Sequence, residues 1–259
     1  MQHSNISSHG PLFRLESEDI DQLIACLKSR GYTVIGPTIQ DGAILHQEIT
    51  SASDLPLGMS DEQQPGSYRL KSRNDKAMFG YAVGPQSFKK FLFPPFLRLF
   101  SIAKNDGKFE VTRGDQQESA SRKKYAFFGI RPCELHAILI QDKVFLSQVF
   151  QDGYYKAVRE NILMVAVNCG QPASTCFCAS LHTGPRAEHG YDLCLTEILK
   201  DGEHYFVLEV GTDRGSELLS ELPHRQASED EVREIDHVID SAAQSIKRDL
   251  DTSGLKEVL

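Results

Sequence analysis

The chain has 259 residues and a formal net charge of −8, and 40% of its residues are hydrophobic. This composition is typical of a globular protein with a substantial core, and the acidic balance argues against nucleic-acid binding and against binding to anionic membranes. No apolar run approaches the ~18 residues that a transmembrane helix needs, and the polar start, MQHSNISSHG, lacks the apolar region of a signal peptide. We therefore expect a cytoplasmic protein without membrane insertion, whose six cysteines are free, metal-bound or catalytic.

Residues 1–120 are expected to form an N-terminal α+β segment. Apolar residues recur at helical spacing over about residues 18–30, which predicts a helix. The turn sequences Asp41-Gly42 and Asn105-Asp106-Gly107 predict two hairpins. Two further features are an irregular region rich in Gly and Pro over residues 51–84 and, within it, a short strand over residues 79–83.

Residues 121–259 are predicted to form an α/β region that ends in a long helix. Residues 125–130 and 162–167 are continuous apolar runs, and the segment between them has helical periodicity. Apolar strands that alternate with helices favour parallel pairing in a covered sheet. We therefore expect an α/β fold with a central, mostly parallel sheet and flanking helices. The later elements expected are a strand over 204–210, a short helix over 216–222 and a long helix over about 229–250.

Four cysteines follow the two central strands. Cys133 comes after the first strand and Cys169 after the second, and Cys176 and Cys178 lie in the compact loop that continues from Cys169. Because the carboxyl ends of neighbouring parallel strands meet at one sheet edge, these cysteines can converge. A set of four thiolates suits either zinc or an iron–sulfur cluster.

The short C-x-C spacing favours the cluster over zinc. Tetrahedral Zn–S bonds of ~2.3 Å place two sulfur atoms about 3.8 Å apart, whereas residues i and i+2 of an extended segment lie ~6.6 Å apart. A [4Fe–4S] cluster spreads its ligands over four iron corners. The residues expected around the cofactor are Arg131, Asn168, Gly170 and Thr175. Arg131 could offset negative charge on the cluster, although it could equally be a surface residue or pair with a carboxylate.

Several segments resemble one protein family. They include FFGIRPCELHAILIQDKVF, YYKAVRENILMVAVNC, TCFCASLHTGPRAEHGYDLCLTE, DLPLGMSDEQQPGSYRL and FGYAVGPQSFKKFLFPP. They are similar to the beta subunit of soluble sulfhydrogenases and to the related A subunit of anaerobic sulfite reductase. The resemblance implies a cytoplasmic electron-transfer subunit of a multi-subunit oxidoreductase. Its partners would be a flavin/NAD(P)H oxidoreductase subunit and a catalytic redox subunit, of the hydrogenase or sulfite reductase type. The implied cluster ligands are Cys133, Cys169, Cys176 and Cys178.

The sequence departs from that family in one respect and leaves other functions open. Family members typically continue into a ferredoxin-like domain with two C-x2-C-x2-C-x3-C-P runs, which are not found before Leu259, so we expect one cluster at most. One alternative is a structural zinc-binding scaffold. Another is a thiol enzyme, in which a helix N-terminus lowers the pKa of Cys133 and His136 or His182 acts as the base.

Overall fold

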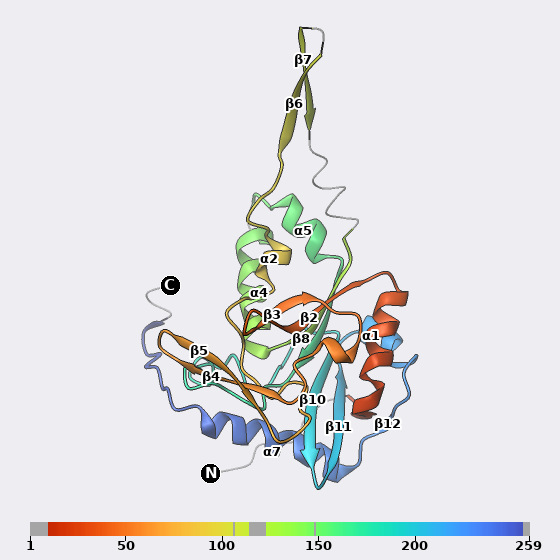
Figure 1. The fold of residues 1–259 in the computed structure, drawn as a ribbon, viewed down its shortest axis with the longest axis vertical. Coiled ribbons are helices and arrows are strands. Elements are labelled where there is room, and N and C mark those ends of the chain that lie inside the picture. Colours follow the sequence, from red (N-terminus) through yellow and green to blue (C-terminus); the bar gives the residue numbers. More distant parts are fainter. Residues whose placement is uncertain (1–9, 106, 114–122, 148, 256–259) are drawn as a thin grey trace.

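The computed structural model describes residues 10–105, 107–113, 123–147 and 149–255. Its centre is a mixed eight-stranded sheet with helices on both faces (Figure 1). In spatial order the strands are β12 (Arg225–Gln226), β1 (Phe13–Glu16), β11 (Glu203–Val210), β10 (Leu193–Lys200), β9 (Ile162–Val167), β8 (Tyr125–Ile130), β2 (Thr33–Gln40) and β3 (Ala43–Glu48).

The α/β class is confirmed, but the prediction of a mostly parallel sheet is wrong. Only the contacts β10–β9, β9–β8 and β8–β2 are parallel, and the other four are antiparallel. Two-residue turns account for some of the antiparallel pairs. Asp41-Gly42 and Asp201-Gly202 all have positive φ, which is the conformation of a hairpin turn that reverses the strand direction. The three parallel pairs lie together in the middle of the sheet, and only β8 and β9 are joined directly by helices, over residues 132–159.

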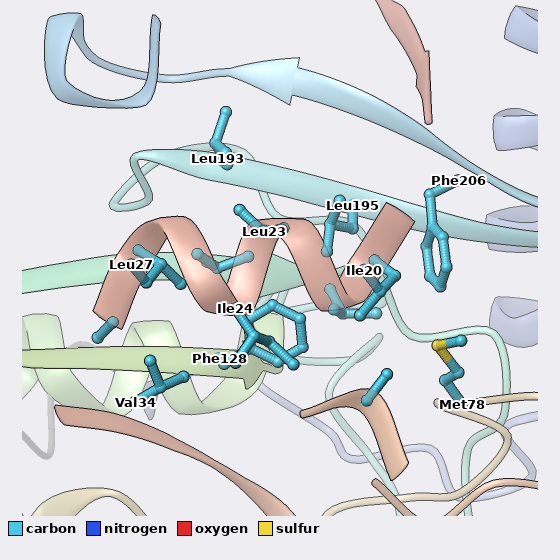
Figure 2. Packing of buried hydrophobic residues seen from close by; sticks show 14 of the residues in the cluster. Ile20, Leu23, Ile24, Leu27, Val34, Met78, Phe128, Leu193, Leu195 and Phe206 are labelled. Atoms are coloured by element: carbon cyan, nitrogen blue, oxygen red, sulfur yellow. The ribbon is translucent and has the colours of Figure 1, made fainter. Parts of the chain in front are cut away.

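The sheet is buried on both faces. Every residue of β9 is buried, as expected for a strand covered from two sides. On one face the apolar side of α1 (Ile20–Ser29) packs against the sheet, with Leu23 and Leu27 among the fully buried residues (Figure 2). The opposite face is covered by α4 (Pro132–Leu146) and α5 (Gly153–Arg159).

Shorter elements complete the body. The remaining helices are η1 (Ser17–Asp19), η2 (Ala52–Asp54), α2 (Lys89–Leu92), α6 (Asp213–Leu219) and α7 (Glu229–Ser245). Helix α7 packs through Ile235 and Ile239 against β10 and β11, and it ends earlier than the sequence predicts. None of the helices formed by the described residues combines the length and the apolar character that crossing a bilayer requires. Residues 1–120 and 121–259 both contribute strands to the sheet, and their division into two regions stays a prediction.

Two separate hairpins leave the central sheet. The first joins β4 (Met59–Gln64) to β5 (Ser67–Ser72). The second joins β6 (Phe100–Asn105) to β7 (Lys108–Arg113), as the turn sequence predicts, and it projects from the body (Figure 1). The strand expected over residues 79–83 is not formed. The physical reason is that the carbonyl groups of this segment bind a buried side chain instead of a neighbouring strand.

Candidate metal centre

Helix α4 positions Cys133. Arg131 is extended (φ −82°, ψ 156°) and precedes Pro132, the first helical residue, so Cys133 lies in the first turn. Proline suits this position because its ring fixes φ and the missing N–H has no partner within the helix. The Glu134 carboxylate accepts a hydrogen bond from the Arg131 backbone N–H at 3.1 Å, which closes the helix end.

The loop after β9 folds back on itself and carries the other three cysteines. The backbone N–H of Cys169 donates to the carbonyl of Pro185 at 3.0 Å, and that of Thr183 donates to the carbonyl of Cys178 at 3.0 Å. A β-carbon added to Gly184 would lie 3.4 Å both from the Cys178 sulfur and from Cβ of Pro132. The Cys178 thiol therefore lies beside the first turn of α4, which also holds Cys133.

The four thiols share one electrostatic environment. Burial raises the pKa of Cys133, and Glu134 and the thiols of Cys169, Cys178 and Cys176 raise it further. Burial, together with the neighbouring cysteines, likewise raises the pKa of Cys178 to about 11. Cys169, Cys176 and Cys178 thus lie on one loop, and Cys178 lies beside the helix turn that holds Cys133. Their role as common ligands stays a prediction. The thiol-enzyme alternative requires a lowered pKa of Cys133, whereas burial and the neighbouring negative groups raise it.

The arrangement is not that of a single-ion site. In the described part of the chain, no three His, Cys, Asp or Glu side chains are grouped closely enough to hold one metal ion. Among the four thiols, Cys176 has the clearest local contact, since its sulfur accepts a hydrogen bond from the backbone N–H of Ala173 at 3.3 Å. Such N–H contacts to sulfur tune the reduction potential of sulfur-bound iron.

Arg131 lies in the interior and acts electrostatically on Cys169 and Cys176, so, of the alternatives left open for it, a surface position is wrong. It is 2% exposed. Its guanidinium donates hydrogen bonds to the carbonyl groups of Phe79 (2.7 Å), Tyr81 (2.9 Å) and Asn168 (3.1 Å). Burial alone would lower its pKa, but Cys169, Tyr81 and two carboxylates outweigh that effect and raise it. Its Nε is buried without a partner among the described residues.

The other three predicted residues have structural contacts of different kinds. The Asn168 side chain donates to Thr196 Oγ1 and accepts from the Ala187 backbone N–H, each at 2.8 Å. The Thr175 hydroxyl donates to Gln63 Oε1 at 3.1 Å. A β-carbon on Gly170 would lie 3.2 Å from Val238 Cγ1, so this glycine lets α7 approach the loop closely. These residues hold the cysteine loop to the rest of the fold.

Two contributors to the site were missed by sequence reasoning. Asp61 of β4 accepts a hydrogen bond from the Ala82 backbone N–H at 2.7 Å and acts electrostatically on Cys176. His46 of β3 lies 3.2 Å from the Glu134 carboxylate. Burial raises the pKa of Glu134 to about 7 and lowers that of His46 to about 4. No sequence pattern links these positions to the cysteines, because only the tertiary fold brings them near.

Comparison with known proteins finds a related subunit. No family model matches the sequence. The chain is, however, 31% identical over 248 residues to sulfhydrogenase 2 subunit beta of Pyrococcus furiosus. Over the length that it spans, the chain is similar to a sulfhydrogenase beta subunit. The match covers 95% of this chain and 63% of the relative. The family resemblance expected from the cysteine motifs is thereby confirmed, and the chain spans less than two thirds of that sulfhydrogenase subunit.

Proposed function

We propose that this chain is an electron-transfer subunit of a hydrogenase-type oxidoreductase and holds one [4Fe–4S] cluster through Cys133, Cys169, Cys176 and Cys178. When bound, such a cluster supplies one-electron transfer. The proposed neighbours in the complex are a flavin/NAD(P)H subunit and a catalytic redox subunit of the hydrogenase or sulfite reductase type. The cytoplasmic location stays a prediction.

The observation that carries the proposal is a buried guanidinium near the cysteine loop. Arg131 donates its hydrogen bonds to uncharged carbonyl groups, and its Nε has no partner among the described residues. Glu134, Glu197 and Cys169 act on it electrostatically, but none of the ion pairs between described residues includes it. A buried charge that is not directly paired is costly. Four deprotonated thiols bound to iron would carry net negative charge, and Arg131 is positioned to offset it.

The surrounding residues affect the protonation of the proposed ligands and the position of their loop. Without metal, the raised pKa values of Cys133, Cys176 and Cys178 favour neutral thiols. Binding of iron must therefore displace protons, so we expect loading of the site to be more complete at higher pH. The Asn168 side chain and the Ala173 N–H keep the loop in place while the thiols change charge.

The two alternatives have less support. Zinc would require sulfur atoms about 3.8 Å apart, and the described residues offer no group of that compactness. A nucleophilic thiol needs its thiolate form at neutral pH, whereas burial raises the pKa of Cys133. We therefore favour the cluster on the short C-x-C spacing of Cys176 and Cys178 and on the similarity to a sulfhydrogenase subunit.

The proposal is tested on the full chain, purified without oxygen and reconstituted with iron and sulfide. We expect close to four iron and four sulfide ions per chain and a low-temperature EPR signal from an S = 1/2 centre after reduction with dithionite. One zinc ion per chain, with no sulfide and no EPR signal, would instead support the scaffold alternative and exclude the electron-transfer role.

A further inference from the structure

Residues 77–82 form a buried segment that belongs to neither a helix nor a strand. All six residues are buried, so their backbone groups need partners within the protein instead of water. Charged side chains from other parts of the fold supply several of these partners. The carbonyl groups of Phe79 and Tyr81 accept hydrogen bonds from Arg131, and we therefore call residues 77–82 the Arg131-binding segment.

Glu197 of β10 binds the N–H groups of this segment. One carboxylate oxygen accepts a hydrogen bond from the backbone N–H of Met78 at 2.6 Å, and the other accepts one from the backbone N–H of Phe79 at 2.9 Å. The ring of His204 lies 2.8 Å from the first oxygen, and the Glu197 side chain is only 9% exposed. Hydrogen bonds to a carboxylate are stronger than those between neutral groups, so Glu197 fixes two consecutive residues of the segment.

Two further contacts hold the Arg131-binding segment in place. Asp61 accepts a hydrogen bond from the backbone N–H of Ala82 at the far end of the segment. The ring of Phe79 packs directly on Gly129 of β8, where an added β-carbon would lie 2.6 Å from Cε1 of Phe79. Gly129 precedes Arg131 by two residues. The positions of the two carbonyl groups are thus set by residues outside the segment.

Phe79 connects Glu197 to Arg131. Glu197 binds the N–H of this residue, and Arg131 binds its carbonyl group at 2.7 Å. The two charged side chains act on each other electrostatically, but none of the ion pairs between described residues joins them. The contact of Glu197 with the guanidinium therefore runs through the backbone of the Arg131-binding segment.

We propose that Glu197 is a positioning residue for Arg131: it fixes the Arg131-binding segment and thereby holds the guanidinium beside the cysteine loop. The inference rests on the proposed function, in which this positive charge would favour the reduced cluster. If the segment were released, the guanidinium would move and the reduction potential would fall. Loss of the Glu197 charge by itself would act in the opposite direction, because removal of a negative charge favours the more negative, reduced form. These opposite signs allow the two effects to be separated.

The first test keeps the charge and changes only the reach of the side chain. Glu197→Asp is one carbon shorter, so we expect it to bind at most one of the two N–H groups. The reduction potential is measured by redox titration followed by EPR on the reconstituted full chain, in the wild-type background and in the Arg131→Gln background. We expect Glu197→Asp to lower the potential in the wild-type background and to change it by less than about a third as much in the Arg131→Gln background.

The second test removes the charge. Glu197→Gln should raise the potential in the Arg131→Gln background, where only the direct effect of the charge is left. In the wild-type background the rise should be clearly smaller or be replaced by a fall. Glu209→Gln is the matched control. Glu209 of β11 pairs with Cys194, three residues from Glu197, and therefore lies on the opposite face of the sheet. Its removal should shift the potential equally in the two backgrounds.

The iron and sulfide content of every sample is measured together with its potential. Equal shifts of Glu197→Asp in the two backgrounds, or an unchanged potential in the wild-type background, would overturn the inference alone and leave the proposed cluster intact. A wild-type chain that holds no iron–sulfur cluster after reconstitution would overturn the proposed function, and the inference with it.

Discussion

The guanidinium of Arg131 donates a hydrogen bond to the carbonyl oxygen of Asn168 at 3.1 Å. Arg131 lies two residues before Cys133, and Asn168 directly precedes Cys169. The contact therefore ties together the ends of β8 and β9, from which the first two proposed ligands depart. It also places a fixed positive charge next to Cys169.

Arg131→Gln should lower the reduction potential of the reconstituted centre. A reduced cluster would carry one more negative charge, which Arg131 would stabilise, so loss of the guanidinium charge would disfavour reduction. We expect a decrease on the order of 50 to 100 mV, measured by redox titration followed by EPR. Arg131→Lys keeps the charge and should recover most of the shift. Arg186→Gln, which removes a charge on the same loop that pairs with Asp236, serves as a control and should have a clearly smaller effect.

The Asn168–Thr196 hydrogen bond should stabilise the cysteine loop measurably. Asn168→Ala leaves the buried Ala187 N–H unpaired and removes the contact with Thr196. We expect a loss of about 2 kcal/mol in the free energy of unfolding, measured by urea denaturation. In a double-mutant cycle, Thr196→Val combined with Asn168→Ala should cost about 1 kcal/mol less than the sum of the two. Strict additivity would mean that this hydrogen bond contributes nothing to stability.

Glu231 should make the protein sensitive to acid. Burial alone would raise the pKa of this carboxyl, but Arg225, Arg14 and Ser228 outweigh it and lower the pKa to about 2. Because the unfolded chain titrates near 4.5, the ionised carboxylate contributes stability above that pH and loses it as the pH falls towards 2. We expect Glu231→Gln to lower the free energy of unfolding by about 2 kcal/mol at pH 7. The variant should also show a weaker dependence of this free energy on pH between pH 4.5 and 2. Glu229→Gln, exposed in the same first turn, should leave that profile nearly unchanged.

Gly170 should be required for the close contact between the cysteine loop and α7. Gly170→Ala introduces a carbon 3.2 Å from Val238 Cγ1, and we expect a loss of about 1 kcal/mol in the free energy of unfolding. Val238→Ala removes the facing methyl groups, so the double variant should lose less stability than the sum of the two single losses. A loss equal to or greater than that sum would show that the two positions do not conflict sterically.

Local patterns in the sequence predicted the local structure well. Strands β8 and β9 begin and end where their apolar runs do, and both hairpin turns form where Gly follows Asp or Asn-Asp. Strands β1 and β10 were missed, as were β4 and β5, which form in the region expected to be irregular. The sheet direction was wrong because strand order depends on pairing between distant segments. The sequence predicts which strands exist more reliably than which strands become neighbours.

At the candidate site too, the local patterns were predictable from the sequence and the contacts between distant segments were not. The C-x6-C-x-C loop and the Arg131–Cys133 junction are short patterns, so the cysteines could be named from the sequence. The segment expected as a strand over residues 79–83 instead offers the carbonyl groups of Phe79 and Tyr81 to Arg131, about 50 positions away. Asp61 and His46 reach the site in a similar way, through the fold alone.

The central claim is that four cysteines from separate segments hold one iron–sulfur cluster. Its most direct test is the iron and sulfide content of anaerobically reconstituted Cys→Ser variants. Each of the variants Cys133→Ser, Cys169→Ser, Cys176→Ser and Cys178→Ser should contain at least about fivefold less cluster than the wild type. Cys26→Ser and Cys194→Ser should keep the wild-type content. Full iron and sulfide content in the four ligand variants, or equal loss in the two controls, would contradict the account.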